Sequence, residues 1–276
     1  MSQAHTIDLD AYFKRVGYEG GAEATLETLQ ALHRLHPIAI PFENLDILLG
    51  RPPALDPAGL EHKLVAEERG GYCYEHNGLF AAVLEAVGFR VVPLGARVVW
   101  GQPADRITPR THEALFVELD GEAWLADVGF GREAMSAPLR LNTDEPQRTP
   151  HGTYRVTPNG HELLIELQTP LDERLPMYLL SLEPQADIDL ELSNWWVATH
   201  PSSPFTQTLR VARLLEDGGR IGLLDREFTE RGPDGSLKKR VLAPGEVAGV
   251  LSSRFDLPFA WSPELEPIFA GLPEPD

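Results

Sequence analysis

The chain of 276 residues contains one cysteine, Cys73, whose surroundings favour a reactive thiol. A lone cysteine is often a small buried hydrophobic residue, so its context has to separate packing from chemistry. The segment Arg69-Gly70-Gly71-Tyr72 precedes it and a run with helical periodicity follows, which places Cys73 in the first turn of a helix. Unpaired amides at a helix N-terminus favour a thiolate, and the two glycines allow a close backbone approach. Cys73 is therefore the candidate nucleophile.

A thiolate nucleophile needs a general base, and the base needs a group that orients it. Composition does not select the base, because the chain has nine histidines. The strand-like segments 112–119 and 122–128 flank Asp120-Gly121, a dipeptide preferred in two-residue hairpin turns. Closing the hairpin at this turn puts His112 and Asp127 on the same face as diagonal neighbours, about 7–8 Å apart at the backbone. The hairpin therefore pairs a candidate base with a candidate orienting carboxylate.

This pairing depends on the length of the turn, since a three-residue loop would move one of the two side chains to the other face. Both strand segments are apolar on both faces, so the pair should be buried. A buried aspartate needs a hydrogen-bond donor, and the ring of His112 supplies one. A local rival for the base is His76, three residues after Cys73, but its neighbour Glu75 should point elsewhere and cannot orient it.

Helices are expected in the first third of the chain. Leucines recur every third residue from 26 to 35, which predicts a helix there. Asp56-Pro57 is a favoured helix start, and Gly70-Gly71 should end that helix. A further helix should begin near Cys73 and end at Gly88.

From about residue 90 the hydrophobic period becomes that of strands. The C-terminal part should contain two strand pairs, around residues 217–219 and 233–235, and a helix over 245–255. Before them, five short β-type segments predict an antiparallel sheet or a small barrel, at residues 90–100, 113–119, 122–128, 153–157 and 161–168.

Several motifs together resemble the arylamine N-acetyltransferase family. The run RGGYCYEHN at 69–77 is similar to the active-site signature of that family. Thr111-His112 and the run DVGFG at 127–131 are similar to the segments that carry the rest of its triad. The runs IPFENL at 40–45 and NWWVATHPSSPF at 194–205 resemble two further family segments, so the similarity spans nearly the full chain.

The resemblance implies an α+β fold with a cysteine-peptidase-like Cys-His-Asp core. Residues 1–90 would form an N-terminal helical bundle, residues 91–198 a central antiparallel β-barrel, and residues 199–276 a C-terminal α/β lid. The reaction would move an acetyl group from acetyl-CoA, the acyl-donor substrate, to an arylamine, arylhydrazine or heterocyclic amine without a metal. By matching position, the nucleophile, base and orienting residue would be Cys73, His112 and Asp127.

The same resemblance implies where the substrates bind. The acceptor pocket would be lined by three phenylalanines, which are commonly core residues in other proteins: Phe42, Phe130 and Phe205. The residues near coenzyme A would be Thr111, Gly129, Phe130 and Gly131. The two glycines among them could equally serve a turn.

Composition excludes several classes of function. The chain has 24 Lys and Arg against 42 Asp and Glu, and its formal charge of −18 disfavours binding to nucleic acids and anionic membranes. No run approaches the ~18 apolar residues of a membrane-spanning helix, and the N-terminus lacks the pattern of a secretory signal. One cysteine rules out an intrachain disulfide and a thiolate-rich metal site. These features predict a cytoplasmic protein that acts on small molecules.

Three alternatives to the acetyltransferase remain. The nearest is a macrolactam-forming amide synthase, which resembles the same family but takes its acyl group from a carrier-bound chain. A hydrolase similar to transglutaminase-like cysteine peptidases would use the same order of Cys, His and Asp. The non-enzymatic alternative is an acidic binding protein in which Cys73 only packs, and an inert thiol would indicate it.

Overall fold

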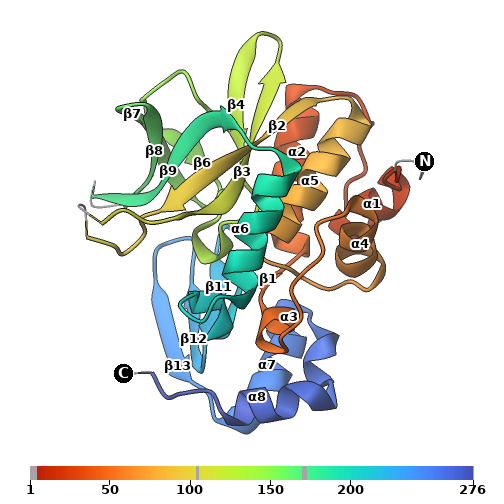
Figure 1. Cartoon of the computed structure of the whole chain (residues 1–276), viewed down its shortest axis with the longest axis vertical. Helices are drawn as coiled ribbons and strands as arrows, with labels where there is room; N and C mark the ends of the chain where they lie inside the picture. The colour runs from red at the N-terminus through yellow and green to blue at the C-terminus, as the bar shows by residue number, and fades with distance from the viewer. Residues whose placement is uncertain (1–4, 104–105, 170–172, 276) are drawn as a thin grey trace.

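The computed structural model describes residues 5–103, 106–169 and 173–275 (Figure 1). Helices of the N-terminal third lie beside the strands of the central third, and the C-terminal strands and helices lie at the opposite end of the molecule (Figure 1). None of the described helices has the length and apolar character needed to cross a membrane. The arrangement is the predicted α+β fold.

Helix α5 (Cys73–Val87) carries Cys73 as its first residue. The carboxylate of Glu75 accepts a hydrogen bond from the amide of Tyr72 at 3.0 Å, which fixes the start of the helix. The helix ends at Gly88, whose φ of 108° is accessible to glycine at little cost. Both predicted ends are confirmed. The other helices of this part are α1 (Leu9–Val16), α2 (Leu26–Ala39), α3 (Leu45–Leu48) and α4 (Pro57–Glu61).

Helix α4 begins as predicted, because Asp56 accepts a hydrogen bond from the amide of Gly59 at 3.0 Å. It does not run as an α-helix to Gly70, but turns into a π-helix over His62–Ala66 and stops there. The chain then has to reach strand β1 (Phe42–Glu43), where the Glu43 amide donates to the Gly71 carbonyl at 2.7 Å. A Cβ atom on Gly70 would collide with the Pro41 carbonyl, so the predicted close approach is confirmed.

The central part is an eight-stranded antiparallel sheet that curves into a nearly closed barrel, with strand order β5-β4-β3-β2-β9-β8-β7-β6. The side-chain amide of Gln147 bridges the two end strands: it accepts from the Arg140 amide at 2.7 Å and donates to the Arg140 carbonyl at 2.9 Å. The strands are β2 (Arg90–Val98), β3 (Arg110–Leu119), β4 (Glu122–Ala126), β5 (Leu139–Arg140), β6 (Gln147–Thr149), β7 (Gly152–Asn159), β8 (Glu162–Gln168) and β9 (Arg174–Pro184).

The β3–β4 hairpin has the predicted two-residue turn. Asp120 and Gly121 have φ values of 53° and 78°, and Leu119 pairs with Glu122 on either side of them. One face of the hairpin packs on the helices through Leu115 and Val117. The other face belongs to the core of the barrel. The hairpin is therefore buried on both faces, as its apolar sequence predicted.

The C-terminal part contains a second, five-stranded sheet with the order β1-β10-β11-β12-β13. It includes both predicted strand pairs, and β1 from the N-terminal third pairs with β10 along its edge. The helix α6 lies in front of the junction between the two sheets (Figure 1). The elements are α6 (Asp187–Thr199), β10 (Arg210–Leu214), β11 (Arg220–Leu224), β12 (Glu227–Arg231), β13 (Leu237–Val241), α7 (Val247–Phe255) and α8 (Glu266–Ala270).

Candidate active site

His112 and Asp127 form a buried hydrogen-bonded pair. Nε2 of His112 lies 2.8 Å from Oδ2 of Asp127, and the two side chains are 3% and 0% exposed. Their strands hold the register that the turn at Asp120 dictates, which puts both residues on the same face. The predicted pairing of base and carboxylate is confirmed as a structural contact.

Further donors surround the Asp127 carboxylate. Oδ1 accepts hydrogen bonds from the side-chain amide of Asn77 and from the Gly129 amide, each at 3.0 Å. Burial favours the neutral carboxyl, but the electrostatic interaction with His112 and these hydrogen bonds outweigh it, so the pKa of Asp127 is lowered. The backbone amide of Asp127 donates to Nε2 of His33 at 3.0 Å. Asp127 is thus held as a carboxylate in one orientation.

The contact with Asp127 also fixes the tautomer of His112. An ionised carboxylate only accepts hydrogen bonds, so Nε2 of a neutral His112 ring must carry the proton. Nδ1 then has the lone pair and can accept a proton. The ring packs against Phe130 and Tyr178, whose centroids lie 5.2 and 5.1 Å from that of His112, and these two rings also contact each other. A neutral His112 ring therefore has the proton-accepting nitrogen that a general base needs.

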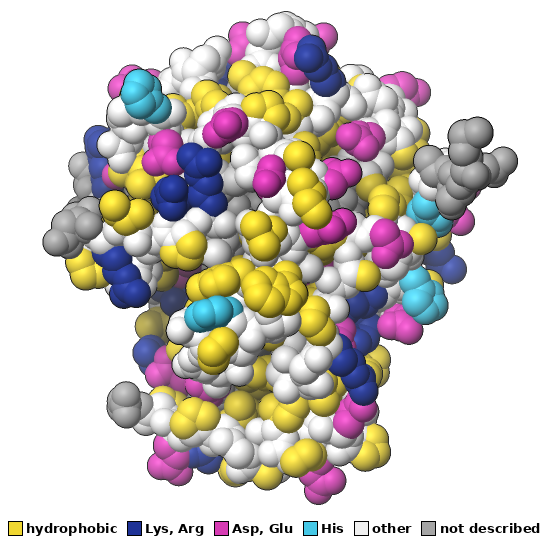
Figure 2. All heavy atoms as spheres, in the orientation of Figure 1, with side chains coloured by type: hydrophobic (Ala, Val, Ile, Leu, Met, Phe, Trp, Pro, Cys, Tyr) yellow, Lys and Arg dark blue, Asp and Glu magenta, His cyan; other side chains and the backbone are white. Residues whose placement is uncertain are grey.

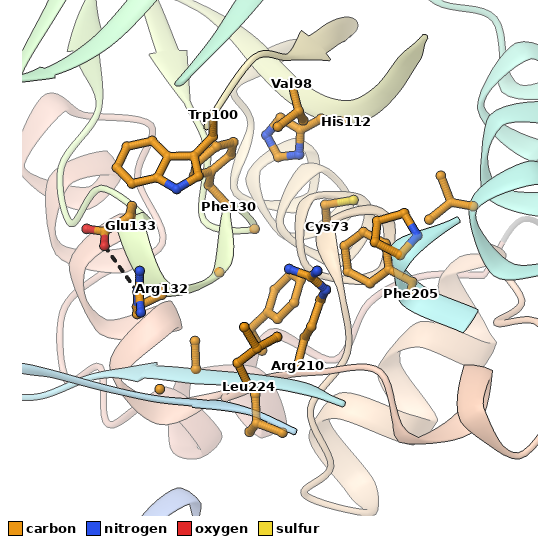
Figure 3. A pocket seen from close by; sticks show the side chains of 18 of the residues that line it. Cys73, Val98, Trp100, His112, Phe130, Arg132, Glu133, Phe205, Arg210 and Leu224 are labelled. Atoms are coloured by element: carbon orange, nitrogen blue, oxygen red, sulfur yellow. Dashed lines mark hydrogen bonds and ion pairs between the residues drawn. The ribbon is translucent and has the colours of Figure 1, made fainter. Parts of the chain in front are cut away.

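Cys73 lines the same cavity as His112 (Figure 3). Its Sγ atom lies 3.9 Å from the carbonyl oxygen of Thr111, the residue before the histidine. Burial raises the pKa of the Cys73 thiol well above its usual value, and the carboxylates of Glu113 and Asp127 raise it further. A hydrogen bond from the Tyr74 amide acts in the opposite direction but is weaker. Burial therefore outweighs the effect of the amides at the helix N-terminus, which the sequence analysis expected to favour a thiolate.

Gly129 lets the loop that follows Asp127 lie against helix α5. A Cβ atom there would stand 2.9 Å from the carbonyl oxygen of Cys73 and 3.0 Å from its Cα, which is too close for any side chain. Asn77 completes this contact, because its Oδ1 accepts from the Val128 amide at 3.0 Å. The backbone of the carboxylate loop is thus in direct contact with the residue that carries the thiol.

His76 cannot replace His112 as the base. Its Nε2 donates to the Pro41 carbonyl at 3.2 Å, and its Nδ1 accepts from Nε2 of His36 at 2.9 Å. Burial lowers the pKa of His76 to about 4. Both ring nitrogens are occupied and the ring is neutral, so the rival interpretation is wrong.

Arg69 does not supply a free positive charge beside Cys73. Its guanidinium group lies 2.9 Å from Glu43 and 3.0 Å from Asp46, and it stacks 3.8 Å above the ring of Phe259. These contacts neutralise the charge and join the segment before Cys73 to the C-terminal helices. The role of Arg69 is therefore structural.

The cavity has a volume of about 490 Å³. It is lined by residues from all three parts of the chain, including the half-buried Trp196 of α6 and Arg210 of β10. Within the described residues, no group of three or more His, Cys, Asp or Glu side chains is placed to hold a metal ion. The predicted residues that line the cavity, besides Cys73 and His112, are Phe42, Thr111, Gly129, Phe130, Gly131 and Phe205.

Sequence reasoning missed three residues around this site. Asn77 stands in the motif at 69–77, yet nothing in its spacing indicates its contact with Asp127. Glu113 is 2% exposed, and burial followed by the charges of Asp127 and Asp187 raises its pKa to about 8. The alternation of strand residues could have placed Glu113 on the helical side of β3, opposite to His112. Tyr178 belongs to β9, a strand that the sequence analysis did not predict.

Comparison with known proteins agrees with this geometry. A family model described as N-acetyltransferase matches residues 25–262. The arylamine N-acetyltransferase of Escherichia coli is 40% identical over 250 residues, which cover 90% of this chain and 88% of that protein. A solved structure of the Mycobacterium marinum arylamine N-acetyltransferase has a TM-score of 0.92 at 38% identity, covering 96% and 99% of the two chains.

A second structure of the M. marinum protein, in complex with CoA, has a TM-score of 0.91 at 37% identity, with the same coverage of 96% and 99%. The match extends through all three parts of the chain, and the motifs at 69–77, 111–112 and 127–131 meet around one cavity. The chain belongs to the arylamine N-acetyltransferase family.

Proposed function

We propose that this protein transfers an acetyl group from acetyl-CoA to the nitrogen of an arylamine, arylhydrazine or heterocyclic amine through an acetyl-Cys73 intermediate. The observation that carries the proposal is the convergence of Cys73 and the His112–Asp127 pair on one cavity. Family membership supports the same chemistry, and the CoA complex of a relative supports acetyl-CoA as the donor.

In the first half-reaction, Nδ1 of His112 takes the proton of the Cys73 thiol, because burial disfavours a thiolate without a nearby cation. The thiolate attacks the thioester carbonyl carbon of acetyl-CoA. The new bond forms between Sγ and this carbon, and the bond between the carbon and the sulfur of CoA breaks. The departing sulfur receives the proton from His112, so free CoA leaves and Cys73 carries the acetyl group.

In the second half-reaction, the lone pair of the amine nitrogen attacks the acetyl carbon on Cys73. The bond from Sγ to carbon breaks, and His112 takes the proton that the nitrogen loses. That proton returns to the Cys73 thiolate, which restores the resting thiol. Asp127 stabilises the His112 imidazolium in each half-reaction through the hydrogen bond at 2.8 Å.

The acceptor pocket in this proposal is the apolar side of the cavity. Phe42 and Phe205 have ring centroids 6.2 Å apart, and Phe130 packs beside His112. Aromatic amines are largely neutral at pH 7, so they enter such a pocket without the cost of desolvating an ion. Thr111 and the loop from Gly129 to Gly131 line the same cavity and would lie near coenzyme A.

We also propose that residues 1–90, 91–198 and 199–276 act as separate parts: a helical bundle with the nucleophile, a barrel with the base and carboxylate, and a lid. A cytoplasmic location accords with the proposed role of Cys73, because a nucleophilic thiol must stay reduced.

The decisive experiment mixes the protein with acetyl-CoA in the absence of amine and measures its intact mass. The parent protein should gain one acetyl group, and Cys73→Ala should gain none while keeping its circular dichroism spectrum. Acetylation of Cys73→Ala, or turnover by that variant, would contradict the covalent mechanism. Addition of aniline should then release the acetyl group from the parent protein as acetanilide.

The same assay separates the alternatives. An amide synthase would take its acyl group from a carrier-bound chain, not from acetyl-CoA, and a hydrolase would release acetate whether or not aniline is present. A binding protein would leave acetyl-CoA intact and would have a Cys73 thiol that reacts slowly with iodoacetamide.

A further inference from the structure

Asp127 lies just beyond the end of its strand, and its backbone amide has a partner from a distant helix. The β3–β4 ladder ends at the pair of Leu115 and Ala126, so Asp127 is the first residue outside it. The amide donates to Nε2 of His33 at 3.0 Å. His33 belongs to α2 and lies 94 residues before Asp127 in the chain. The proposed mechanism gives this histidine no role.

The ring of His33 is held in place by packing. It is 0% exposed and lies edge-on to Phe80 of α5, with ring centroids 5.7 Å apart. Leu32, its neighbour on α2, belongs to the same apolar core as Val128, the residue after Asp127. The acceptor nitrogen and the loop that it contacts are therefore fixed relative to each other.

The hydrogen bond also fixes the protonation of the ring. Nε2 accepts, so the proton of a neutral His33 lies on Nδ1. Burial lowers the pKa of His33 to about 4, although the charge of Asp127 opposes this effect, so the ring is neutral at pH 7. Nδ1 is buried, and no other residue that the structure describes accepts its proton. A buried donor without a partner lowers stability, so packing alone does not account for a histidine here.

We propose that His33 is a positioning residue that orients Asp127 and thereby the base His112. Asn77 of α5 holds the carboxylate of Asp127, and His33 of α2 holds its main chain, so two helices fix one residue. Without the acceptor on His33, the main chain of Asp127 can turn toward another acceptor and weaken the 2.8 Å contact with His112. This inference rests on the acetyl transfer proposed above, since it assigns a residue that supports the base of that reaction.

The first test separates the acceptor atom from the volume of the side chain. His33→Phe fills the space without an acceptor, whereas in His33→Gln the Oε1 atom of the glutamine can replace Nε2. With acetyl-CoA and aniline, His33→Phe should lower kcat about tenfold or more and leave both KM values within about twofold of the parent. His33→Gln should recover most of the lost kcat. A parent-like kcat in His33→Phe, or equal losses in the two variants, would overturn the proposal.

A matched control shows whether any buried histidine would give the same loss. His151 is 6% exposed, its Nε2 donates to the Leu215 carbonyl at 2.8 Å, and its buried Nδ1 likewise has no partner among the described residues. His151→Phe should lower the urea midpoint of unfolding and keep the parent kcat. A loss of kcat in His151→Phe as large as that in His33→Phe would indicate general loosening of the fold and overturn the proposal.

A second test does not depend on acetyl transfer. Alkylation of Cys73 by iodoacetamide at pH 7 requires His112 to take the thiol proton, so His33→Phe should slow it about tenfold and His33→Gln should restore it. A protein that transfers no acetyl group but shows this pattern would lose the proposed function and keep the role of His33. Equal alkylation rates in the parent and in His33→Phe would overturn that role and leave the acetyl transfer standing.

A third measurement uses the parent protein alone, so it applies even if a variant does not fold. NMR of the protein with isotope-labelled histidine should find the His33 proton on Nδ1, with Nε2 unprotonated, at pH 7. A proton on Nε2, or a charged ring, would overturn the proposal, because neither form can accept from the Asp127 amide.

Discussion

Asn77 joins the helix of the thiol to the carboxylate of Asp127: its amide nitrogen donates to Oδ1 of Asp127 at 3.0 Å. The same amide nitrogen also donates to the Glu113 carbonyl at 2.5 Å, and its oxygen accepts from the Val128 amide. One buried side chain on α5 therefore sets the positions of β3, of the loop after β4 and of the carboxylate. The relative positions of the three proposed reactive groups depend on it.

Asn77→Ala should lower kcat by about tenfold or more, because a displaced His112–Asp127 pair no longer faces the thiol correctly. The loss of buried hydrogen bonds should also lower the free energy of unfolding by about 1–3 kcal/mol. Stopped-flow acetylation and urea unfolding measure the two effects. Asn142→Ala is the control, since the exposed Asn142 bonds only to Glu122 among the described residues. Parent-like acetylation rates in Asn77→Ala would refute the positioning role.

Asp127→Asn should reduce kcat by about 10³–10⁴-fold. The amide cannot stabilise the His112 imidazolium, and its NH₂ group can donate to the ring and reverse the tautomer. The variant should bind CoA as the parent does, which a calorimetric titration measures. A loss of less than tenfold would show that His112 works without an orienting carboxylate.

Gly129→Ala should slow acetylation and destabilise the fold, because the new Cβ atom lies within 3.0 Å of the backbone of Cys73. The loop must move away from α5, and it takes Asp127 with it. Thermal unfolding and single-turnover acetylation should both change, by several degrees and about tenfold or more respectively. Gly245→Ala is the control, since a Cβ atom on Gly245 would have no other heavy atom within 4 Å and its φ is not positive. Unaltered acetylation by Gly129→Ala would mean that the loop does not need this close approach.

Glu113 should make the stability of the protein depend on pH. Its pKa is raised to about 8 by burial, whereas the unfolded chain releases this proton near 4.5. The folded state therefore holds one more proton between these values, and stability falls as pH rises from about 4.5 to 8. Glu113→Gln should remove this loss of stability, with a difference on the order of 4 kcal/mol between the ends of the range.

Urea unfolding at a series of pH values measures this effect. Glu118→Gln is the matched control on the same strand, since Glu118 is exposed and pairs with Arg90 at the surface. If the free energies of unfolding of Glu113→Gln and the parent changed in parallel from pH 4.5 to 8, the buried carboxyl would be excluded as the cause of the pH dependence.

Local chemistry made much of this structure predictable. The Asp120-Gly121 turn fixes the register of its hairpin, and that register brings His112 to Asp127. The start of α5 follows in the same way from the glycines before Cys73. Such signals lie within a few residues of the feature that they determine, which explains why the sequence was sufficient to place them.

Two elements gave weaker signals. Strand β9 contains Pro176 and has a register shift where it meets β8, so its pattern lacks regular alternation. Helix α6 exposes Ile188, Leu192 and Trp195, which are 68%, 63% and 57% exposed, so its apolar residues do not mark a buried face. Arg210 could not be assigned either, because it reaches the cavity through pairing between β1 and β10, which are distant in the sequence.

The pairing of β1 with β10 has a consequence for biosynthesis. Phe42 pairs with Ala212 of β10, a strand that lines the cavity. A nascent chain that has been synthesised only as far as residue 200 therefore contains the three proposed reactive residues but lacks one wall of the cavity. Such an intermediate leaves the Cys73 thiol more open to cellular electrophiles than the complete chain does, because the cavity-lining residues within 204–212 and 222–229 are missing from it. The thiol is therefore synthesised before the part of the cavity wall that shields it. Rapid completion of the last third of the chain shortens the interval in which the thiol is exposed.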